Sequence, residues 1–314
     1  MAILLTDKDL PRCLSMAEAI DAVERALAER RAGTAVSHPR SHWPVGSSGF
    51  TVTPGGFQSM DVLGMRVYLR RATANDQLTV VWELNSRRLE GLIVGSGIGA
   101  IRTGAIGGVA YKRLAPVEMT SAAVVGGGYQ SRTQLLALQV ARPKLESVAL
   151  YRRDPDHRRL AAQQLSEELA IPVSPVNRAV DAVRSADTVI LATDSSTPAL
   201  QADWLKRGAH VSSLGPKYRG RSEIGPDLFE WAEQIVCDFP EEYRRDEDFL
   251  LHGLPRENDI QDLAKVVEGP IDRPSGRNTL FLSHGLAGTE VSVAHRALTN
   301  AKKRGVGTLI PYES

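Results

Sequence analysis

The sequence predicts an α/β protein that combines a doubly wound parallel sheet with a second, α+β domain formed by both chain termini. Short apolar strands alternate with helical segments from about residue 119 to 280. Before them, runs of alternating apolar and polar residues indicate antiparallel strands. The helical segment 285–304 lies outside the alternation, so we expect it to return to the first domain. The expected domains are therefore 1–118 with 281–314, and 119–280.

The N-terminal part begins with an expected edge strand, Ile3–Leu5. Ser15 followed by Glu18 forms a capping-box pattern, which predicts an amphipathic helix that runs through Arg30 and stops at Gly33. Strands of an antiparallel sheet follow, and a helix rich in small residues leads into the second domain. The expected strands and helix are 36–57 (strands joined by turns), 62–70, 79–84, 91–94 and helix 98–114.

The second domain opens with the stretch TSAAVVGGGYQSRT, residues 120–133. Gly126 and Gly128 stand at the first two positions of a G-x-G-x-x-G pattern, and Ser131 fills the third. Gly126 would make a tight turn, and Gly128 would let the backbone approach a pyrophosphate at the helix N-terminus beside Tyr129 and Gln130. The sequence therefore predicts a dinucleotide site at this turn.

The residues after the turn support this interpretation. A helical segment at 135–140 ends at Pro143, and Ser147–Tyr151 is a second apolar strand. A strand-helix-strand unit of roughly 30 residues is what a Rossmann-type domain requires. Further strands are expected at 173, 187–192 and 210–214, and 234–237 is the last that the pattern identifies.

The choice of nicotinamide cofactor depends on the end of the second strand. An acidic residue there binds the ribose of NAD, whereas an arginine accommodates the phosphate of NADP. Here the strand runs into Arg152 and Arg153, while Asp154 precedes Pro155 and is expected to cap the next helix. The arginines favour NADP(H) over NAD(H). The alternative is that both are solvated surface charges.

Composition excludes several classes of function. The chain has 314 residues, of which 42% are hydrophobic and 24% charged, with a net charge of +1. This charge gives no electrostatic footprint for nucleic acid or a membrane surface. Only Cys13 and Cys237 are present, and they lack metal-site spacing. His38 and His42 have the spacing of a metal pair, but Pro39 and Pro44 exclude a regular helix there and no cysteine or carboxylate completes a site. We expect a cytoplasmic protein without a metal.

Four stretches resemble the ornithine cyclodeaminase/mu-crystallin family. They are IRTGAIGGVA (101–110), VGGGYQS (125–131), ATDSSTP (192–198) and GVGT (305–308). The resemblance implies a homodimer with a Rossmann domain plus a substrate and dimerisation domain. It also implies hydride transfer between a nicotinamide and the α-carbon of an amino or imino acid.

Carried over by position, the resemblance implies that Arg102 binds the substrate carboxylate, with Arg40 and Arg66 completing the cluster. The remaining positions would serve the cofactor. Thr103 would contact its phosphates, Arg102 would also touch the cofactor, and Thr79 would lie on the nicotinamide side. Thr193 and Ser195 would border it at the carboxyl end of the sheet.

The sequence departs from this family at two catalytic positions. Arg66 stands where a lysine is usual, and arginine cannot exchange a proton near neutral pH. Lys217 replaces an aspartate, and if desolvated it could be the general acid to the imine nitrogen; the alternative is a solvated loop residue. Arg40, Arg66, Arg102 and Lys217 would make a strongly cationic pocket, better matched to an anion with more than one carboxylate.

These departures favour an imino-acid reductase or amino-acid dehydrogenase over a true cyclodeaminase, which eliminates ammonia from a diamino acid. An acid to hold the side-chain ammonium of ornithine is missing from 50–56. A second alternative remains open. The chain could be a weakly catalytic or non-catalytic protein that keeps the cofactor and binds a small anionic ligand.

Overall fold

The structure, a computed structural model, describes residues 1–70, 77–245, 247–253, 255–269 and 276–312. The chain divides into two compact units, Met1–Ile106 with Leu286–Ser314, and Gly107–Gly285. Helix α3 (Gly97–Leu114) contributes residues to both. The two chain ends meet in the first unit, where the first and last strands pair.

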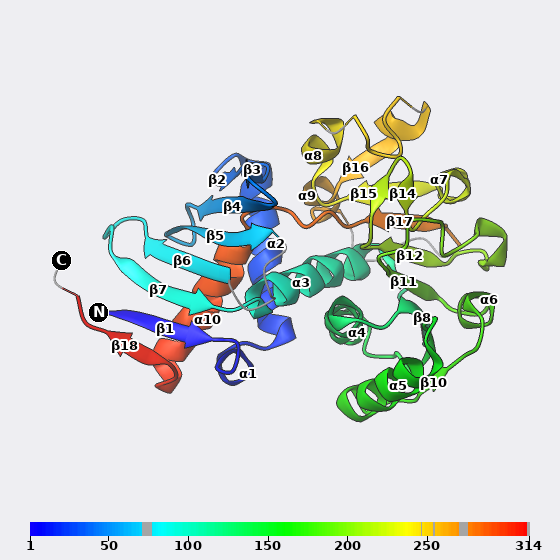
Figure 1. The fold of residues 1–314 in the computed structure, drawn as a ribbon, viewed down its shortest axis with the longest axis horizontal. Helices are drawn as coiled ribbons and strands as arrows, with labels where there is room; N and C mark the ends of the chain where they lie inside the picture. Colours follow the sequence, from blue (N-terminus) through cyan, green and yellow to red (C-terminus); the bar gives the residue numbers. More distant parts are fainter. Residues whose placement is uncertain (71–76, 246, 254, 270–275, 313–314) are drawn as a thin grey trace. The chain divides into compact units, whose positions relative to one another are not determined.

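The first unit is one mixed sheet with helices on one face (Figure 1). Its strand order is β18-β1-β7-β6-β5-β4-β2, and β3 pairs with β4. The strands are β1 (Ala2–Thr6), β2 (Ala35–Ser37), β3 (Ser41–Val45), β4 (Ser48–Phe57), β5 (Val62–Arg70), β6 (Gln77–Glu83), β7 (Leu89–Val94) and β18 (Thr308–Ile310). The helices are α1 (Leu10–Cys13), α2 (Met16–Ala32), the start of α3 and α10 (Thr289–Arg304).

Helix α10 covers the inner face of this sheet. It contacts β4, β5, β6 and β7 and packs on α2. Close packing needs small residues on the strands: a Cβ on Gly64 would come within 3.1 Å of the Val291 side chain. Helix α2 carries the predicted capping box, in which Ser15 and Glu18 exchange hydrogen bonds, and Gly33 ends it in the left-handed conformation.

The expectation that residues 3–5 form an edge strand is wrong. Strand β1 pairs in parallel with β7 on one side and antiparallel with β18 on the other. The covering strand comes from the far end of the chain, which no local pattern near residue 3 reveals. Residues 84–88 form the hairpin connection between the antiparallel strands β6 and β7.

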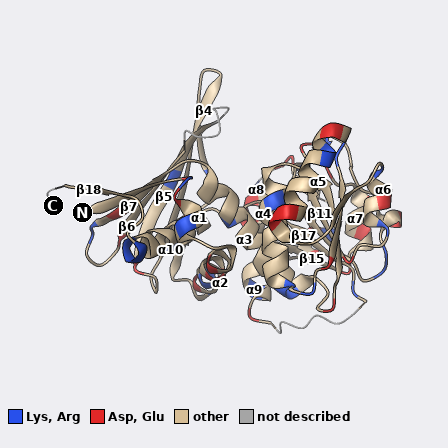
Figure 2. Ribbon diagram, turned by 90° about the horizontal axis from the view of Figure 1, so that it is seen from below, with Lys and Arg blue, Asp and Glu red and all other residues tan. Residues whose placement is uncertain are grey.

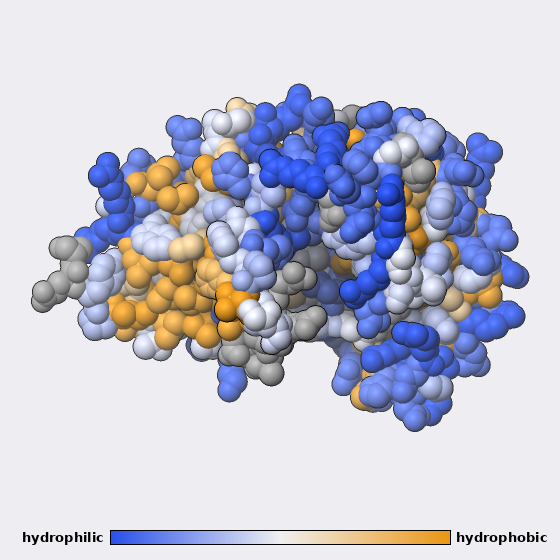
Figure 3. Space-filling model, turned by 45° about the horizontal axis from the view of Figure 1, so that its top comes forward, coloured by the Kyte–Doolittle hydropathy of each residue, from blue (hydrophilic) through white to orange (hydrophobic). Residues whose placement is uncertain are grey.

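The outer face of the sheet is apolar and has no helix on it within the described residues. Paired strands place Phe50 opposite Leu69 and Leu78 opposite Val94 on this face. Phe50, Leu63, Leu69 and Val94 are all exposed. Figure 3 shows a large hydrophobic patch on the same side of the molecule, over this sheet. We call Phe50, Leu63, Leu69, Leu78 and Val94 the outer apolar face.

The second unit is a parallel sheet with helices on both sides, and it confirms the predicted Rossmann-type architecture. The strand order is β10-β9-β8-β11-β12-β17-β15-β16, and every pair is parallel. These strands are β8 (Ser121–Gly126), β9 (Ser147–Tyr151), β10 (Val173–Pro175), β11 (Thr188–Ala192), β12 (His210–Ser213), β15 (Gln234–Cys237), β16 (Ile260–Asp262) and β17 (Thr279–Leu282). A separate antiparallel pair, β13 (Lys217–Tyr218) and β14 (Arg221–Ser222), follows β12 in the chain.

The helices of this unit carry both signs of charge on their outer surfaces, and the strands between them are mostly uncharged (Figure 2). They are α4 (Tyr129–Ala141), α5 (Pro155–Leu169), α6 (Ala179–Val183), α7 (Pro226–Trp231), α8 (Pro240–Arg245) and α9 (Leu263–Val266). Two short 3-10 turns span Ala202–Trp204 and Pro255–Asp259.

The sequence pattern missed two strands of the sheet that follow 234–237 in the chain. Strand β17, with the sequence TLFL, follows it in the chain and inserts between β12 and β15, with all four residues buried. Strand β16 then extends the edge beyond β15. Both strands are short and lie far from the glycine turn in sequence, so the local pattern gives a weak signal for them.

Candidate functional site

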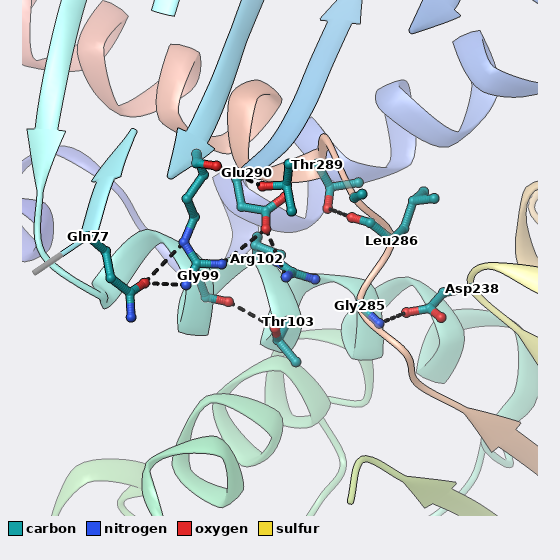
Figure 4. A network of polar contacts seen from close by, with 12 residues as sticks. Gln77, Gly99, Arg102, Thr103, Asp238, Gly285, Leu286, Thr289 and Glu290 are labelled. Atoms are coloured by element: carbon teal, nitrogen blue, oxygen red, sulfur yellow. Dashed lines mark hydrogen bonds and ion pairs between the residues drawn. The ribbon is translucent and has the colours of Figure 1, made fainter. Parts of the chain in front are cut away.

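Two buried arginines of the first unit share one carboxylate (Figure 4). The Oε1 atom of Glu290 accepts a hydrogen bond from Arg102 Nη2 at 2.8 Å and lies 3.2 Å from Arg66 Nη1. The Glu290 side chain is fully buried, and those of Arg66 and Arg102 are only 11% and 6% exposed. The structure thus brings together Arg66 and Arg102, as the sequence predicted, but adds an acid between them.

Arg66 is held on several sides. Its Nε donates to Gln77 Oε1 at 3.1 Å, its Nη2 also bonds that oxygen, and its guanidinium lies 4.6 Å from the centre of the Tyr68 ring. A Cβ on Gly99, in the first turn of α3, would come within 2.6 Å of the guanidinium. Glycine at this position therefore leaves the space that the arginine occupies.

The other predicted residues of the first unit lie near this pair to different degrees. Thr79 is buried directly opposite Arg66 in the β5–β6 register. Arg40, between β2 and β3, is half-buried and close enough to Glu290 to affect its titration. Thr103 follows Arg102 in α3, and its hydroxyl donates to Gly99 O at 2.8 Å.

Glu290 is ionised in this setting. Burial by itself would raise the pKa of the Glu290 carboxyl, but the positive charges of Arg102, Arg66 and Arg40 outweigh it, so the pKa lies below its ordinary value. Arg66, Glu290 and Arg102 therefore form a buried arginine-carboxylate-arginine bridge, which we call the Glu290 bridge.

The glycine turn of the second unit has the geometry that the motif predicts. Gly126 ends β8 with φ +128°, and a Cβ there would lie 2.3 Å from Ala192 O of the neighbouring strand. Gly128 is the N-cap of α4 and has open space around it among the described residues. The first backbone N–H groups of α4 therefore face a position where an anion can approach.

The residues that follow the glycines divide into outer and inner positions. Tyr129 is 54% exposed, and Gln130 accepts a hydrogen bond from Thr133 through its backbone oxygen. Ser131 is fully buried, and its Oγ would lie 3.4 Å from a Cβ on Gly126. Ser131 thus packs the helix against the strand, the role of the third glycine in the motif.

Arg152 and Arg153 differ in their surroundings. Arg152 Nη1 donates to Gly127 O at 3.2 Å, so this arginine lies against the glycine turn. The Arg153 side chain is 82% exposed and is 3.9 Å from Asp194. Asp154 caps α5 as expected: it accepts from His157 N at 2.9 Å, and this backbone hydrogen bond lowers the pKa of the Asp154 carboxyl.

Thr193 and Ser195 follow β11 at the carboxyl edge of the sheet. The backbone N and the hydroxyl of Thr193 both donate to Glu223 Oε2, at 2.9 and 2.8 Å. Ser195 Oγ donates to Thr197 O at 2.7 Å, within the same loop. Glu223 is fully buried and also accepts from Ser213 Oγ at 2.7 Å and Gly215 N at 2.6 Å. It therefore ties the loop after β11 to the loop after β12.

Lys217 is 3% exposed, so it is not a solvated loop residue. Its Nζ donates to Gly215 O at 2.7 Å and to Ser283 O at 3.1 Å, which joins the loop after β12 to the loop after β17. Burial lowers the pKa of the Lys217 ammonium, while the Glu223 and Asp238 carboxylates oppose that shift.

Asp238 extends this pattern to the next strand. It follows β15 and accepts hydrogen bonds from His284 N and Gly285 N, each at 2.8 Å, in the loop after β17 (Figure 4). Three buried charges, Glu223, Lys217 and Asp238, therefore connect the carboxyl ends of the adjacent strands β11, β12, β17 and β15.

Sequence reasoning missed the residues that support the predicted ones: Gln77, Gly99, Glu223, Asp238 and Glu290. Glu223 and Asp238 occur in segments that look like polar loops, and Glu290 looks like an ordinary acid in the first turn of a helix. A buried role for each depends on contacts with distant residues. An acid directly after a buried strand, as at Asp238, was the one available signal.

Three further features of the described residues bear on function: a cavity, possible metal ligands and possible membrane-spanning helices. A cavity of about 850 Å³ in the second unit is lined by residues of β15, β16, α8 and α9 rather than by the glycine turn. Within the described ranges, no group of three histidine, cysteine or acidic side chains is placed to hold a metal ion. No described helix has both the length and the apolar character needed to cross a membrane.

Comparisons with known proteins agree with this architecture along the whole chain. The model of the ornithine cyclodeaminase/mu-crystallin family matches residues 2–305. The iminosuccinate reductase of Paracoccus denitrificans is 26% identical over 321 residues, which are 97% of this chain and 98% of that protein.

Solved structures have the same fold. Delta(1)-pyrroline-2-carboxylate reductase of Thermococcus litoralis, in complex with NADH and L-proline, is 28% identical, with a TM-score of 0.88 over 98% of this chain and 100% of that chain. An archaeal alanine dehydrogenase dimer with bound NAD is 23% identical, with a TM-score of 0.84 over 99% of each chain.

Proposed function

This chain belongs to the ornithine cyclodeaminase/mu-crystallin family, and from that premise we propose that it is an NAD(P)-dependent imino-acid reductase or amino-acid dehydrogenase. The observation that carries the proposal is the buried pair Arg66 and Arg102, since a guanidinium binds a carboxylate through charge-assisted hydrogen bonds. Relatives named as reductases of pyrroline-2-carboxylate and iminosuccinate support the reaction class.

In this proposal the second unit holds the cofactor. The pyrophosphate would rest on the N–H groups at the start of α4, beside Gly126, Gly128, Tyr129, Gln130 and Ser131. Thr103 would also contact the phosphates. Thr193 and Ser195 would border the cofactor at the carboxyl end of the sheet, with Thr79 on the nicotinamide side. When bound, the nicotinamide supplies a hydride to the α-carbon of the imine, or accepts one from the amine.

The residues of this chain would bind and orient the substrate and move one proton. Arg102 and Arg66, with Arg40, would hold the substrate carboxylate and so fix the direction of the α-carbon. Reduction of a C=N bond adds a hydride to carbon and a proton to nitrogen. Lys217 is our candidate for the proton donor, because burial lowers the pKa of its ammonium.

We expect wild-type protein to oxidise NADPH or NADH when given an α-keto acid together with ammonia or methylamine. Arg102→Lys keeps the charge but loses the two-pronged guanidinium, so kcat/KM should fall about 100-fold. Nicotinamide absorbance measures both. The exposed Arg159→Lys is the control and should match wild type. Absence of turnover with every keto acid and amine would leave the non-catalytic binding protein as the function.

Lys217→Arg tests the proton donor, because arginine keeps the positive charge but does not release its proton near neutral pH. We expect kcat to fall about 100-fold or more. In wild type, turnover should decline as pH rises through the pKa of Lys217, which lies below that of an ordinary lysine. Lys206→Arg is the control. A Lys217→Arg protein with wild-type kcat and pH profile would exclude Lys217 as donor.

We further propose that NADP(H) is preferred over NAD(H), although the two solved structures described above carry NADH and NAD. Arg152 and Arg153 support this preference, and the carboxylate of Asp154 is engaged as a helix cap. Titration followed by nicotinamide fluorescence should show tighter binding of NADPH. Arg153→Ala should weaken NADPH binding about tenfold, by loss of one charge-assisted contact, and leave NADH unchanged. Tighter NADH binding by wild type would refute the preference.

We also propose a homodimer that buries the outer apolar face of the first unit, because contiguous exposed apolar side chains mark surfaces that bind other proteins. Light scattering during gel filtration should give the mass of two chains. Leu69→Glu, which places a charge on this face, should give one chain. Leu160→Glu alters an equally exposed leucine of the second unit and should remain dimeric. A monomeric wild type would refute the dimer.

A further inference from the structure

The Glu290 bridge contains a carboxylate in addition to the two arginines that would bind a carboxylate substrate. Glu290 Oε1 lies 2.8 Å from Arg102 Nη2 and 3.2 Å from Arg66 Nη1. Because the Glu290 side chain has no solvent exposure, it does not offer a contact surface to a small molecule. Any influence of Glu290 on a substrate must therefore act through its charge and through the two guanidiniums.

The charge of the bridge is smaller than the arginines alone suggest. Two guanidiniums and one ionised carboxylate leave a net charge of +1. The neighbouring Arg40 favours the ionised form of Glu290, and so do both bonded arginines. The negative charge is therefore present whenever a substrate binds near neutral pH.

A fixed negative charge acts differently on ligands with one and two carboxylates. Coulomb repulsion rises with ligand charge, so a dianion at the arginine pair is repelled by Glu290 more strongly than a monoanion, by at most about twofold because its second carboxylate lies farther away. Within a buried setting this repulsion is poorly screened. Glu290 thus opposes the attraction that the number of arginines would give to a dicarboxylate.

We propose that Glu290 is a specificity-determining residue, which biases the arginine pair toward imino acids with a single carboxylate over those with two. The proposal rests on the proposed function, since it assigns the substrate carboxylate to Arg66 and Arg102. It also gives the bridge a second role. Glu290 holds two like charges side by side, so the pair is formed before the substrate arrives.

The test compares binding of propionate and succinate by isothermal titration calorimetry in wild type, Glu290→Gln and Glu290→Met. Both variants remove the charge, Gln with retained hydrogen bonding and Met with similar volume. We expect the ratio of succinate affinity to propionate affinity to rise about fivefold in each folded variant. Thermal unfolding identifies which variants are folded.

Glu90→Gln provides the matched control. Glu90 is a buried carboxylate of the same unit that pairs with His295 of α10 at 2.7 Å, without contact to the arginines in any described interaction. Its neutralisation should leave the ratio unchanged. A merely structural role for Glu290 would weaken both ligands by the same factor.

Two results would overturn the proposal: a ratio within twofold of wild type in a folded neutral variant, or no binding of either anion to any of the proteins. Because binding is measured without turnover, the result is separate from the proposed reaction. An inactive protein with a shifted ratio would refute the reductase assignment alone, and an active enzyme with an unshifted ratio would refute the role of Glu290 alone.

Discussion

The hydrogen bonds from two guanidiniums to the single carboxylate of Glu290 are the interaction on which the proposed substrate site depends. Two buried arginines side by side repel each other and lose hydration, so each needs a counter-charge. Arg66 comes from β5, Arg102 from α3 and Glu290 from α10. The bridge therefore links β5, α3 and α10 through their side chains. Close packing of α10 on the sheet brings the first turn of this helix to the arginines.

The second unit uses buried charges in a comparable way. Parallel strands leave loops at one edge, where ligands bind in folds of this type. Glu223, Lys217 and Asp238 each connect the loops of two neighbouring strands, so four loops are fixed by side chains rather than by additional strands. Such fixed loops are suited to hold a cofactor in one orientation.

Features set by local chemistry could be predicted from the sequence. The capping box at Ser15 and the glycine turn at Gly126 depend on residues within a few positions of each other, and the structure has both. The alternation of strands and helices likewise identified the parallel sheet. Arg66 and Arg102 could be selected only through the resemblance to a family, since neither has a distinctive neighbourhood in sequence.

Features set by distant partners could not be predicted. Strand β17 is four residues long and gains its place from β12 and β15, and β1 is covered by β18 from the other end of the chain. Glu290 is buried against arginine donors more than 180 positions away in the sequence. Glu223 is buried against donors up to 30 positions away. No pattern of hydrophobic residues reports such contacts, because the partners are polar.

The most direct measurement is a crystal structure of the protein with NADPH and propionate. We expect the propionate carboxylate within hydrogen-bond distance of the Arg102 guanidinium, with Glu290 still bonded to both arginines. Propionate bound elsewhere, with the hydrogen bonds of Arg66 and Arg102 satisfied by Glu290 and protein groups alone, would contradict the assignment of this pair to the substrate.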